Sequence, residues 1–360
     1  MRFRNTKEPS PFLSQRLWVY NASVPKWTGN ELRRRRARHG LGIAALAAAC
    51  AGAEGQELRR WQERTGPGPS PRAEFGFAYD SERQRSVLLG GSSTLNFRAV
   101  NPQTWEWDGA AWQLVSELGP ERRCDNAMAY DSARHLVVSF GGYNGKYMAD
   151  TWAWDGSTWN RHDVAGPQAR ADSFMAFDSR RGVMVLFGGQ AADGTILGDT
   201  WEWNGTSWKR VADGGPPARW IQRMAFDDAR GVTVMFGGAS ETGVHGDTWE
   251  WDGGTWTQRT PSASPTARYG PAMAYDADRK VTVLFGGQSN FAFGSGVLGD
   301  TWEWDGENWR RLEIDGPDAR TFVKMVYDRR RKACVMFGGY DGKQARADTW
   351  ELASAKPSRP

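Results

Sequence analysis

The fold is decided by a stretch that reads PQAR (167–170), MAFD (175–178), SRRGVMVLFGG (179–189), DTWEWNG (199–205) and TSW (206–208). Its glycine pair recurs at 90/91, 141/142, 188/189, 237/238, 286/287 and 338/339, at spacings of 51, 47, 49, 49 and 52 residues. Six copies of a unit this long indicate a repeat architecture, in which each copy forms one structural unit.

Each copy predicts four short strands. The MAFD segment and the apolar run after it flank a tight turn, and the TWEW segment is separated from the next tryptophan by an Asp-Gly or Asn-Gly turn, a strong hairpin signal. A four-stranded antiparallel sheet is therefore expected for each copy. The spacing of GG, DTWEWDG and the final Trp resembles that of the kelch family over residues 61–352. This resemblance implies an all-β fold, a six-bladed kelch-type β-propeller of the kind found in galactose oxidase.

The two ends of the repeat region are expected to meet in one blade. The last copy stops at DTWEL (348–352) without a final Trp strand, whereas Trp61 lies 11 residues before Arg72, the same spacing as between Trp112 and Arg123. We expect residues 58–64 to complete the last blade, which removes an open sheet edge. The propeller is predicted over residues 54–356, followed by a tail at 357–360, with blades near 72–115, 123–164, 170–211, 219–259, 268–312 and 320–352.

Residues 1–53 are predicted to be a leader. The basic segment RRRRARHG (33–40) precedes an apolar, small-residue stretch (41–53) that is too short to span a bilayer, the order of a secretory signal peptide. Cleavage after Ala53 predicts free secretion, whereas Ala47–Cys50 resembles a lipoprotein box with Ala in place of the usual Leu, and predicts lipidation of Cys50 at the cell envelope. The alternative is an alanine-rich helix packed on the body. Residues 1–30 lack this pattern, which suggests that translation starts later.

The charge distribution argues against a nucleic-acid partner. The chain has a formal net charge of +4, but residues 1–39 carry ten Lys or Arg and two acids, which leaves 36 basic and 40 acidic residues for the rest. A body with this balance has no general attraction for phosphates. Three Cys in 360 residues provide neither a disulfide framework nor a paired spacing for zinc. We therefore expect no cofactor and no bound metal, and a monomeric protein.

The two ends of the propeller are expected to differ. The turn between the first two strands and the gap of 7 residues between the tryptophans are constant, whereas the segment from GG to TW contains 12, 8, 10, 9, 13 and 9 residues. In an up-and-down blade, this variable connection lies at the same end as the connections between blades. We call that end the variable face and the opposite end the regular face. Binding loops on a rigid scaffold tend to be the variable ones.

Features repeated in every blade are interpreted as structural. Seventeen of the 20 Trp occupy repeated positions in the third and fourth strands, where large rings fill gaps between blades. The arginines of the PxxR segments are interpreted as bridges between blades rather than as an anion site. The aspartates ten residues before each first glycine are expected to start turns, and those before Thr-Trp to be structural as well. The latter position holds Gln103 in the first blade.

Candidate functional positions follow each of these arginines. Period-2 alternation places the residues two and four positions later on one strand face at the mouth of the central channel. The first set is Glu74, Asp125, Asp172, Ile221, Gly270 and Phe322, and the second is Gly76, Ala127, Phe174, Arg223, Ala272 and Lys324. Acids thus fall in the first three blades, and bases in the fourth and sixth. This mouth would suit a sugar, a zwitterion or a charged peptide; the alternative is that these side chains pair across the channel and bind nothing.

Further ligand-binding candidates lie in the variable loops and at a strand start. Their rings could stack on a ligand or form a hot spot of an interface. The alternative is that each ring caps a blade and excludes water from it. The candidates are Phe97, Tyr143, Tyr147, Trp220, His245, Phe291, Phe293 and Tyr340.

Two classes of function are compatible with this pattern. A copper-radical oxidase is disfavoured because the four His of the chain are too dispersed to share a metal. A fold-level resemblance to kelch-type sialic acid epimerases implies a sugar-active enzyme, in which Glu74, Asp172, Arg223 and Lys324 transfer a proton. Calcium held by Glu74, Asp125 and Asp172 would have one ligand per blade, which is sparse. Kelch membership most often implies recognition, so the sequence favours an exported binding module for a protein or a glycan.

Overall fold

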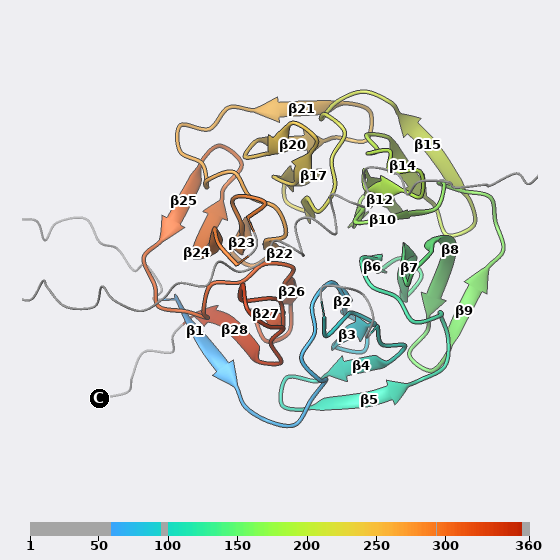
Figure 1. Ribbon diagram of the computed structural model, residues 1–360, viewed down its shortest axis with the longest axis horizontal. Coiled ribbons are helices and arrows are strands. Elements are labelled where there is room, and N and C mark those ends of the chain that lie inside the picture. Colours follow the sequence, from blue (N-terminus) through green and yellow to red (C-terminus); the bar gives the residue numbers. More distant parts are fainter. Residues whose placement is uncertain (1–58, 95–99, 293, 355–360) are drawn as a thin grey trace, which may run out of the picture.

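The computed structural model describes residues 59–94, 100–292 and 294–354. Within these residues the regular structure consists of β-strands, and six four-stranded antiparallel sheets surround a central axis (Figure 1). The predicted six-bladed β-propeller is therefore confirmed. In the described part of the chain, no helix is long and apolar enough to cross a membrane. The predicted leader (1–53) and tail (357–360) lie outside the described residues.

In five blades chain order follows spatial order from the axis to the rim, whereas in the sixth the first strand of the chain, β1, takes the place at the rim (Figure 1). The first blade consists of β2 (Gly76–Asp80), β3 (Arg85–Leu89), β4 (Thr104–Trp107) and β5 (Trp112–Ser116). The second consists of β6 (Ala127–Asp131), β7 (Leu136–Tyr143), β8 (Tyr147–Trp154) and β9 (Trp159–His162). The third consists of β11 (Phe174–Asp178), β12 (Val183–Phe187), β14 (Thr200–Trp203) and β15 (Trp208–Ala212). The fourth blade consists of β16 (Arg223–Asp227), β17 (Val232–Phe236), β20 (Thr248–Trp251) and β21 (Trp256–Arg259). The fifth consists of β22 (Ala272–Asp276), β23 (Val281–Gln288), β24 (Val297–Trp304) and β25 (Trp309–Leu312). The sixth consists of β26 (Lys324–Asp328), β27 (Ala333–Phe337), β28 (Thr349–Ser354) and β1 (Arg59–Arg64).

Two short strand pairs extend the blades toward the variable face. They are β10 (Arg170–Ala171) with β13 (Gln190–Ala191), and β18 (Ala239–Ser240) with β19 (Gly243–Val244).

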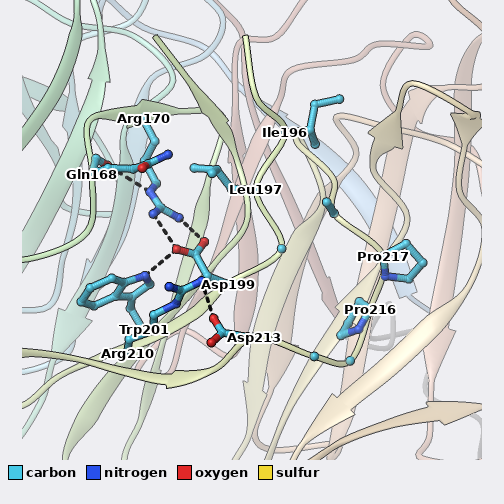
Figure 2. A pocket seen from close by; sticks show the side chains of 14 residues that line it. Gln168, Arg170, Ile196, Leu197, Asp199, Trp201, Arg210, Asp213, Pro216 and Pro217 are labelled. Atoms are coloured by element: carbon cyan, nitrogen blue, oxygen red, sulfur yellow. Dashed lines mark hydrogen bonds and ion pairs between the residues drawn. The ribbon is translucent and has the colours of Figure 1, made fainter. Parts of the chain in front are cut away.

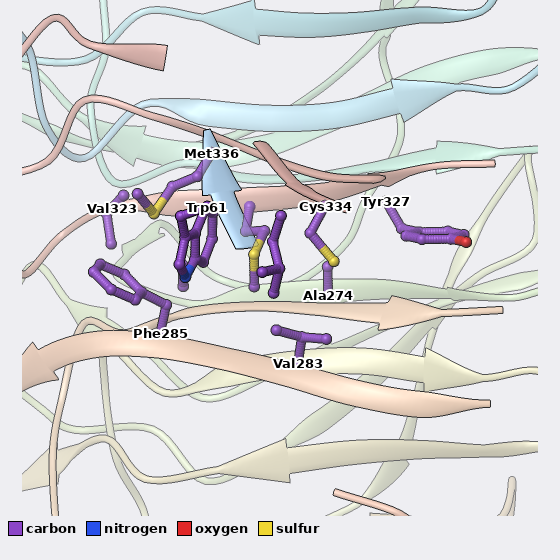
Figure 3. Packing of buried hydrophobic residues seen from close by; sticks show 11 residues of the cluster. Trp61, Ala274, Val283, Phe285, Val323, Tyr327, Cys334 and Met336 are labelled. Atoms are coloured by element: carbon purple, nitrogen blue, oxygen red, sulfur yellow. The ribbon is translucent and has the colours of Figure 1, made fainter. Parts of the chain in front are cut away.

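The ring closes through β1, as predicted. This strand pairs with β28 and places Trp61 opposite Leu352. Trp61 is buried and packs edge-on against Phe285 of the neighbouring blade, with ring centroids 5.3 Å apart (Figure 3). Arg59 adds ion pairs to Asp276 (2.8 Å) and Glu303 (3.0 Å) of the same neighbour. The first described strand thus joins the last two blades by packing and by charge.

The PxxR arginines act within their blades, which differs from the expected bridges between blades. Arg170 is fully buried, donates to the carbonyl of Gly188 at 3.0 Å, and forms a bidentate pair with Asp199 at 2.7 and 2.9 Å. Both groups belong to its own blade. Contacts between blades come from the backbone instead. The carbonyls of five of the six arginines accept a bond from the glycine pair of the preceding blade, as Arg219 does from Gly189 at 2.9 Å. The structural role expected for the Asp before Thr-Trp is confirmed by these pairs.

The turn-starting role of the other aspartates is also confirmed. Asp178 Oδ1 accepts bonds from the backbone N–H groups of Arg180 and Arg181 at 3.0 Å each. Its second oxygen pairs with the Arg181 guanidinium at 2.7 Å. This local bonding fixes the hairpin turn on the regular face of the blade.

Candidate functional site

A ring of backbone hydrogen bonds surrounds the axis where the innermost strands begin. The residue two positions after each PxxR arginine donates its N–H to the carbonyl of its counterpart in the neighbouring blade, over 2.7–3.3 Å. Six such bonds run head to tail around the ring. All six residues have a left-handed backbone, with φ between 54° and 65°, and they are Glu74, Asp125, Asp172, Ile221, Gly270 and Phe322.

The predicted residues come together because of this backbone ring, and not because they alternate along a strand. Five of its six members are not glycine, and the left-handed conformation costs about 1–3 kcal/mol for such residues unless the surroundings enforce it. The first set therefore lies in a bend before the strand, not on the alternating strand face that was expected. Side chains from both sets nevertheless line one small cavity at the axis.

The charged candidates form a closed cluster. Glu74, Asp125, Asp172, Arg223 and Lys324 line a common cavity of only about 10 Å³, and each is less than a tenth exposed. The prediction that these residues come together agrees with this arrangement, whereas the prediction of an open channel mouth at the variable face was wrong. The left-handed ring narrows the axis here, and a space of this size admits at most about one water molecule.

Burial dominates the electrostatics of the two bases. It lowers the pKa of Arg223 to about 10, against the opposing effect of the three carboxylates. Burial, followed by the charge of Arg223, holds the pKa of Lys324 well below its usual value. Both cations also lie over the Phe174 ring, at 4.9 Å for Arg223 and 4.5 Å for Lys324. Charges of both signs thus lie together at the axis.

Cys124 joins this cluster and was missed as a candidate from the sequence. A donor atom of Glu74, one of Cys124 and one of Asp125 lie within 4.8 Å of one another, and Cys124 Sγ is 3.4 Å from Asp125 Oδ2. Thiolate and carboxylate ligands together favour zinc over calcium, yet structural zinc sites use four protein ligands and the described residues bring three together here. The sequence did offer one signal for including Cys124, because it directly precedes the candidate residue Asp125.

An apolar layer covers the cluster on the variable face. It consists of Ala73, Ile221, Ala239, Tyr269, Phe322 and Tyr340, with Trp220 and Val244 packed against it. Tyr340 is only 8% exposed, so this predicted ligand-binding residue serves here as a cap. Trp220 is partly exposed at the edge of the same layer.

The other loop candidates are dispersed over the variable face. Tyr143 and Tyr147 pack edge-to-face at 5.0 Å, and Tyr147 donates to Gln190 at 3.0 Å. His245 lies 2.8 Å from Ser240, and burial, followed by the charge of Arg219, lowers its pKa. Phe291 stacks on Tyr269 and remains 37% exposed. Phe97 and Phe293 lie outside the described residues.

Two adjoining hollows lie between the third and fourth blades on the variable face. The first measures about 550 Å³, and its wall includes Gln168, Trp201, Arg210 and Asp213 (Figure 2). Trp201 is held by a bond from its indole nitrogen to Asp199 at 2.7 Å, and Arg210 pairs with Asp213. Sequence reasoning missed these residues because Trp201 and Asp199 repeat in other blades and were interpreted as structural.

The second hollow measures about 470 Å³ and is lined by Asp193, Thr195, Glu241 and Thr242 among others. Ile196 and the Pro217–Ala218 segment line both hollows, so the two share a wall. Together they offer short polar side chains next to a partly exposed indole ring.

Comparisons with known proteins identify the fold and no family. No family model matches the chain, and neither does any curated protein. Among solved structures, the chain is similar to one described as "Structure of YjhT", with 14% identity and a TM-score of 0.62 over 81% of this chain and 97% of that chain. At this identity the likeness supports the propeller fold alone.

Proposed function

We propose that this protein is a kelch-type binding module that recognises a glycan through the two hollows on its variable face. The observation that carries the proposal is the contrast between the two candidate regions. The charged cluster at the axis encloses about 10 Å³, whereas the hollows offer about 550 and 470 Å³ with polar walls. Ligand sites are concave and present a few convergent polar groups.

The chemistry of the hollows suits hydroxyl-rich ligands. The side chains of Arg210 and Asp213 are about half and two-thirds exposed, and they present donors and acceptors side by side. Asp193 and Glu241 provide further acceptors in the second hollow, while Trp201 provides an apolar ring edge in the first. Sugars combine hydroxyl groups with apolar C–H faces, so both kinds of surface are useful.

A protein partner is favoured less. Protein interfaces depend on a few exposed aromatic anchors. Among the described loop candidates, Phe291 alone has more than a third of its surface exposed.

A sialic-acid-epimerase type of enzyme is favoured less as well. A catalytic acid or base must lie within hydrogen-bond reach of its substrate. The space beside Glu74, Asp172, Arg223 and Lys324 does not accommodate a sugar. We assign these residues a structural role at the axis.

The proposal includes export. It is supported by the basic segment at 33–40 and the apolar stretch at 41–53. Free secretion and lipidation at Cys50 remain the two alternatives, and mass spectrometry of the mature N-terminus from an expressing cell distinguishes them.

The test of glycan binding uses the full chain and a panel of defined oligosaccharides, followed by calorimetry with the tightest binder. We expect Arg210→Gln to weaken binding about ten-fold, the effect of losing a charge-assisted hydrogen bond. Arg311→Gln is the matched control, because Arg311 stands at the equivalent position two residues after Trp309 and pairs with Glu313 in another blade. No binding across the panel, or equal losses in the two variants, would contradict the proposal.

A further inference from the structure

A separate cavity occupies the central channel at the opposite end of the propeller. It measures about 430 Å³ and is lined by the innermost strands of all six blades. Residues of the first hairpin turns, including Ser81, Ser132, Ser179, Asp228 and Arg329, also line it, so it opens on the regular face. None of the candidate binding residues from the sequence except Phe174 belongs to it.

The cavity is blind at its inner end. Phe174 lines the cavity, while Arg223 and Lys324 lie over the ring of Phe174 and line the small cavity of the charged cluster. Beyond them, the hydrogen-bonded ring and the apolar layer close the axis. A ligand can therefore enter from the regular face and end against an aromatic floor.

The walls owe their width to a ring of small residues. One position of each innermost strand carries a short apolar side chain, at Ala78, Ala129, Ala176, Ala225, Ala274 and Val326. Ala129, the partly exposed member of this set, is the position at which a larger side chain would extend into the channel. The small ring leaves a space of the size that ligand pockets usually have.

Aromatic residues surround the outer part of the channel and are held in place by neighbouring blades. The Tyr79 hydroxyl donates to Asp328 at 2.8 Å, and the Tyr327 hydroxyl donates to Asp278 at 2.6 Å. Each of these bonds joins a tyrosine to the adjacent blade. The pocket is thus preformed, which reduces the entropic cost of binding.

The rim has an excess of basic residues. One arginine in each first hairpin turn lies within ion-pair distance of the aspartate that starts it. Apart from these arginines, the six turns contain five basic and three acidic residues. Most of the five have partners: Arg180 donates to backbone carbonyls of the next blade, Arg330 to Gln84, and Lys332 to Asp278. Arg329 lines the cavity, is exposed, and makes no hydrogen bond or ion pair to any other described residue, although, after the hydrogen bond from Lys332, its charge helps to lower the pKa of Asp278.

We propose that this cavity binds a small amphipathic carboxylic acid, with its apolar body between the alanine walls and its carboxylate at Arg329. The orientation of the acid, with its carboxylate at the rim, follows from the charges at the inner and outer ends of the cavity. The axial cluster contains three acids and two bases, so it does not attract a second carboxylate, whereas the rim carries an excess of positive charge. The hydroxyls of Ser81 and Ser132 at the rim can donate hydrogen bonds to the second oxygen of the acid.

The test is calorimetric titration of the full chain with decanoate and with 2-naphthoate, which separate an aliphatic from an aromatic body. Two controls share the aliphatic body of decanoate: decan-1-ol carries no charge, and decylammonium carries a positive charge. We expect at least one of the two acids to bind, and the matching body without a carboxylate to bind about ten-fold more weakly. Failure of both acids to bind, or equal binding of decanoate and decylammonium where decanoate binds, would overturn the proposal.

Two variants and a control locate the site. Arg329→Gln should weaken binding of the acid about ten-fold, while Arg330→Gln, at the adjacent residue that does not line the cavity, should leave it within about two-fold. Ala129→Leu fills the channel from a half-buried position and should abolish binding in a protein that still melts cooperatively. Equal effects of the two arginine variants, or unchanged binding in folded Ala129→Leu, would overturn the assignment. Glycan binding at the variable face is measured separately and is expected to be unaffected.

Discussion

The indole nitrogen of Trp61 donates a hydrogen bond to Thr301 Oγ1 over 3.0 Å, although 240 positions separate the two residues in the chain. The same bond recurs at every blade junction, from the Trp of a fourth strand to the Thr of the preceding blade's third strand. The other pairs span 2.8–2.9 Å and are Trp112–Thr349, Trp159–Thr104, Trp208–Thr151, Trp256–Thr200 and Trp309–Thr248. The junction made by the chain's first described strand is therefore chemically equivalent to the junctions within the continuous repeats.

Trp61→Ala should lower the free energy of unfolding by about 3–5 kcal/mol, the usual cost of truncating a buried Trp. The reason is the loss of packing against Phe285 together with the bond to Thr301. Trp61→Phe retains much of the packing and should cost less, near 1–2 kcal/mol for the lost bond and the smaller ring. Urea unfolding monitored by circular dichroism measures both values.

Leu118→Ala is the control for this series, because Leu118 is 83% exposed and should change stability by less than about 0.5 kcal/mol. A midpoint for Trp61→Ala equal to that of this control would show that β1 contributes nothing to closure.

Repetition explains why the fold could be predicted so far from sequence. Each blade uses the same turn residues and the same tryptophans, so the six copies specify blade number, and the spacing of Trp61 from Arg72 specifies closure. The left-handed ring could not be predicted in this way. Five different residue types occupy it: Gly270 and the two Asp are of types that tolerate positive φ, whereas Glu74, Ile221 and Phe322 are not.

The location of the cavities was also hidden. Ala129 and its counterparts follow the strand pattern of an ordinary core, so nothing in the sequence separates a residue that lines a channel from one that packs. Similarly, Glu74 and Lys324 were correctly expected near the axis, but their burial depends on the apolar layer above them. That layer is contributed by several blades, and single-strand periodicity does not describe it.

Gln103→Asp should stabilise the protein. Arg72 is buried like the other PxxR arginines, but its partner is the Gln103 amide at 3.2 Å instead of a carboxylate. Burial consequently lowers the pKa of Arg72 to about 10, so the charged guanidinium costs stability at any pH below that value. A carboxylate there should add about 1–2 kcal/mol, as charge-assisted hydrogen bonds do. An unchanged or lower midpoint in urea at pH 7 would contradict the expectation.

Asp199→Asn tests the equivalent pair of the third blade, Arg170 with Asp199, in the opposite direction and adds a pH dependence. Burial alone would raise the pKa of Asp199, but the hydrogen bond and charge of Arg170 outweigh it, and the net pKa is lowered. Stability from this carboxylate is therefore present above its unfolded pKa near 3.9 and is lost as pH falls through the lower folded pKa. The variant should cost about 1–3 kcal/mol at pH 7 and progressively less below pH 4.

Unfolding midpoints of the wild-type protein and Asp199→Asn, measured from pH 7 to pH 2.5, should therefore converge. The pKa values of Asp150, Asp247, Asp300 and Asp348 are lowered in the same way, so the wild-type protein should itself lose stability steeply below pH 4. A difference between the two proteins that stays constant over this range would exclude the ion pair as its source.

Gly270→Ala should destabilise the axial ring. Gly270 has φ of +65°, and a Cβ there would meet Thr321 Oγ1 at 2.5 Å and the backbone nitrogen of Phe322 at 3.0 Å. That nitrogen donates to the carbonyl of Gly270 at 2.8 Å, so relief of the clash stretches a bond of the ring. We expect a loss of about 1–3 kcal/mol, in the range of a strained backbone position.

Gly254→Ala is the matched control, because it has no positive φ and a new Cβ would approach only Asp252 Oδ1, at 3.7 Å. Amide hydrogen exchange adds a readout specific to the ring: the N–H groups of Gly270 and Phe322 are bonded around the axis and should exchange slowly in the wild-type protein. In the Gly270→Ala variant, exchange at residue 322 should accelerate more than exchange in the β22–β23 hairpin. Uniform acceleration would indicate a general loss of stability instead of a local opening of the ring.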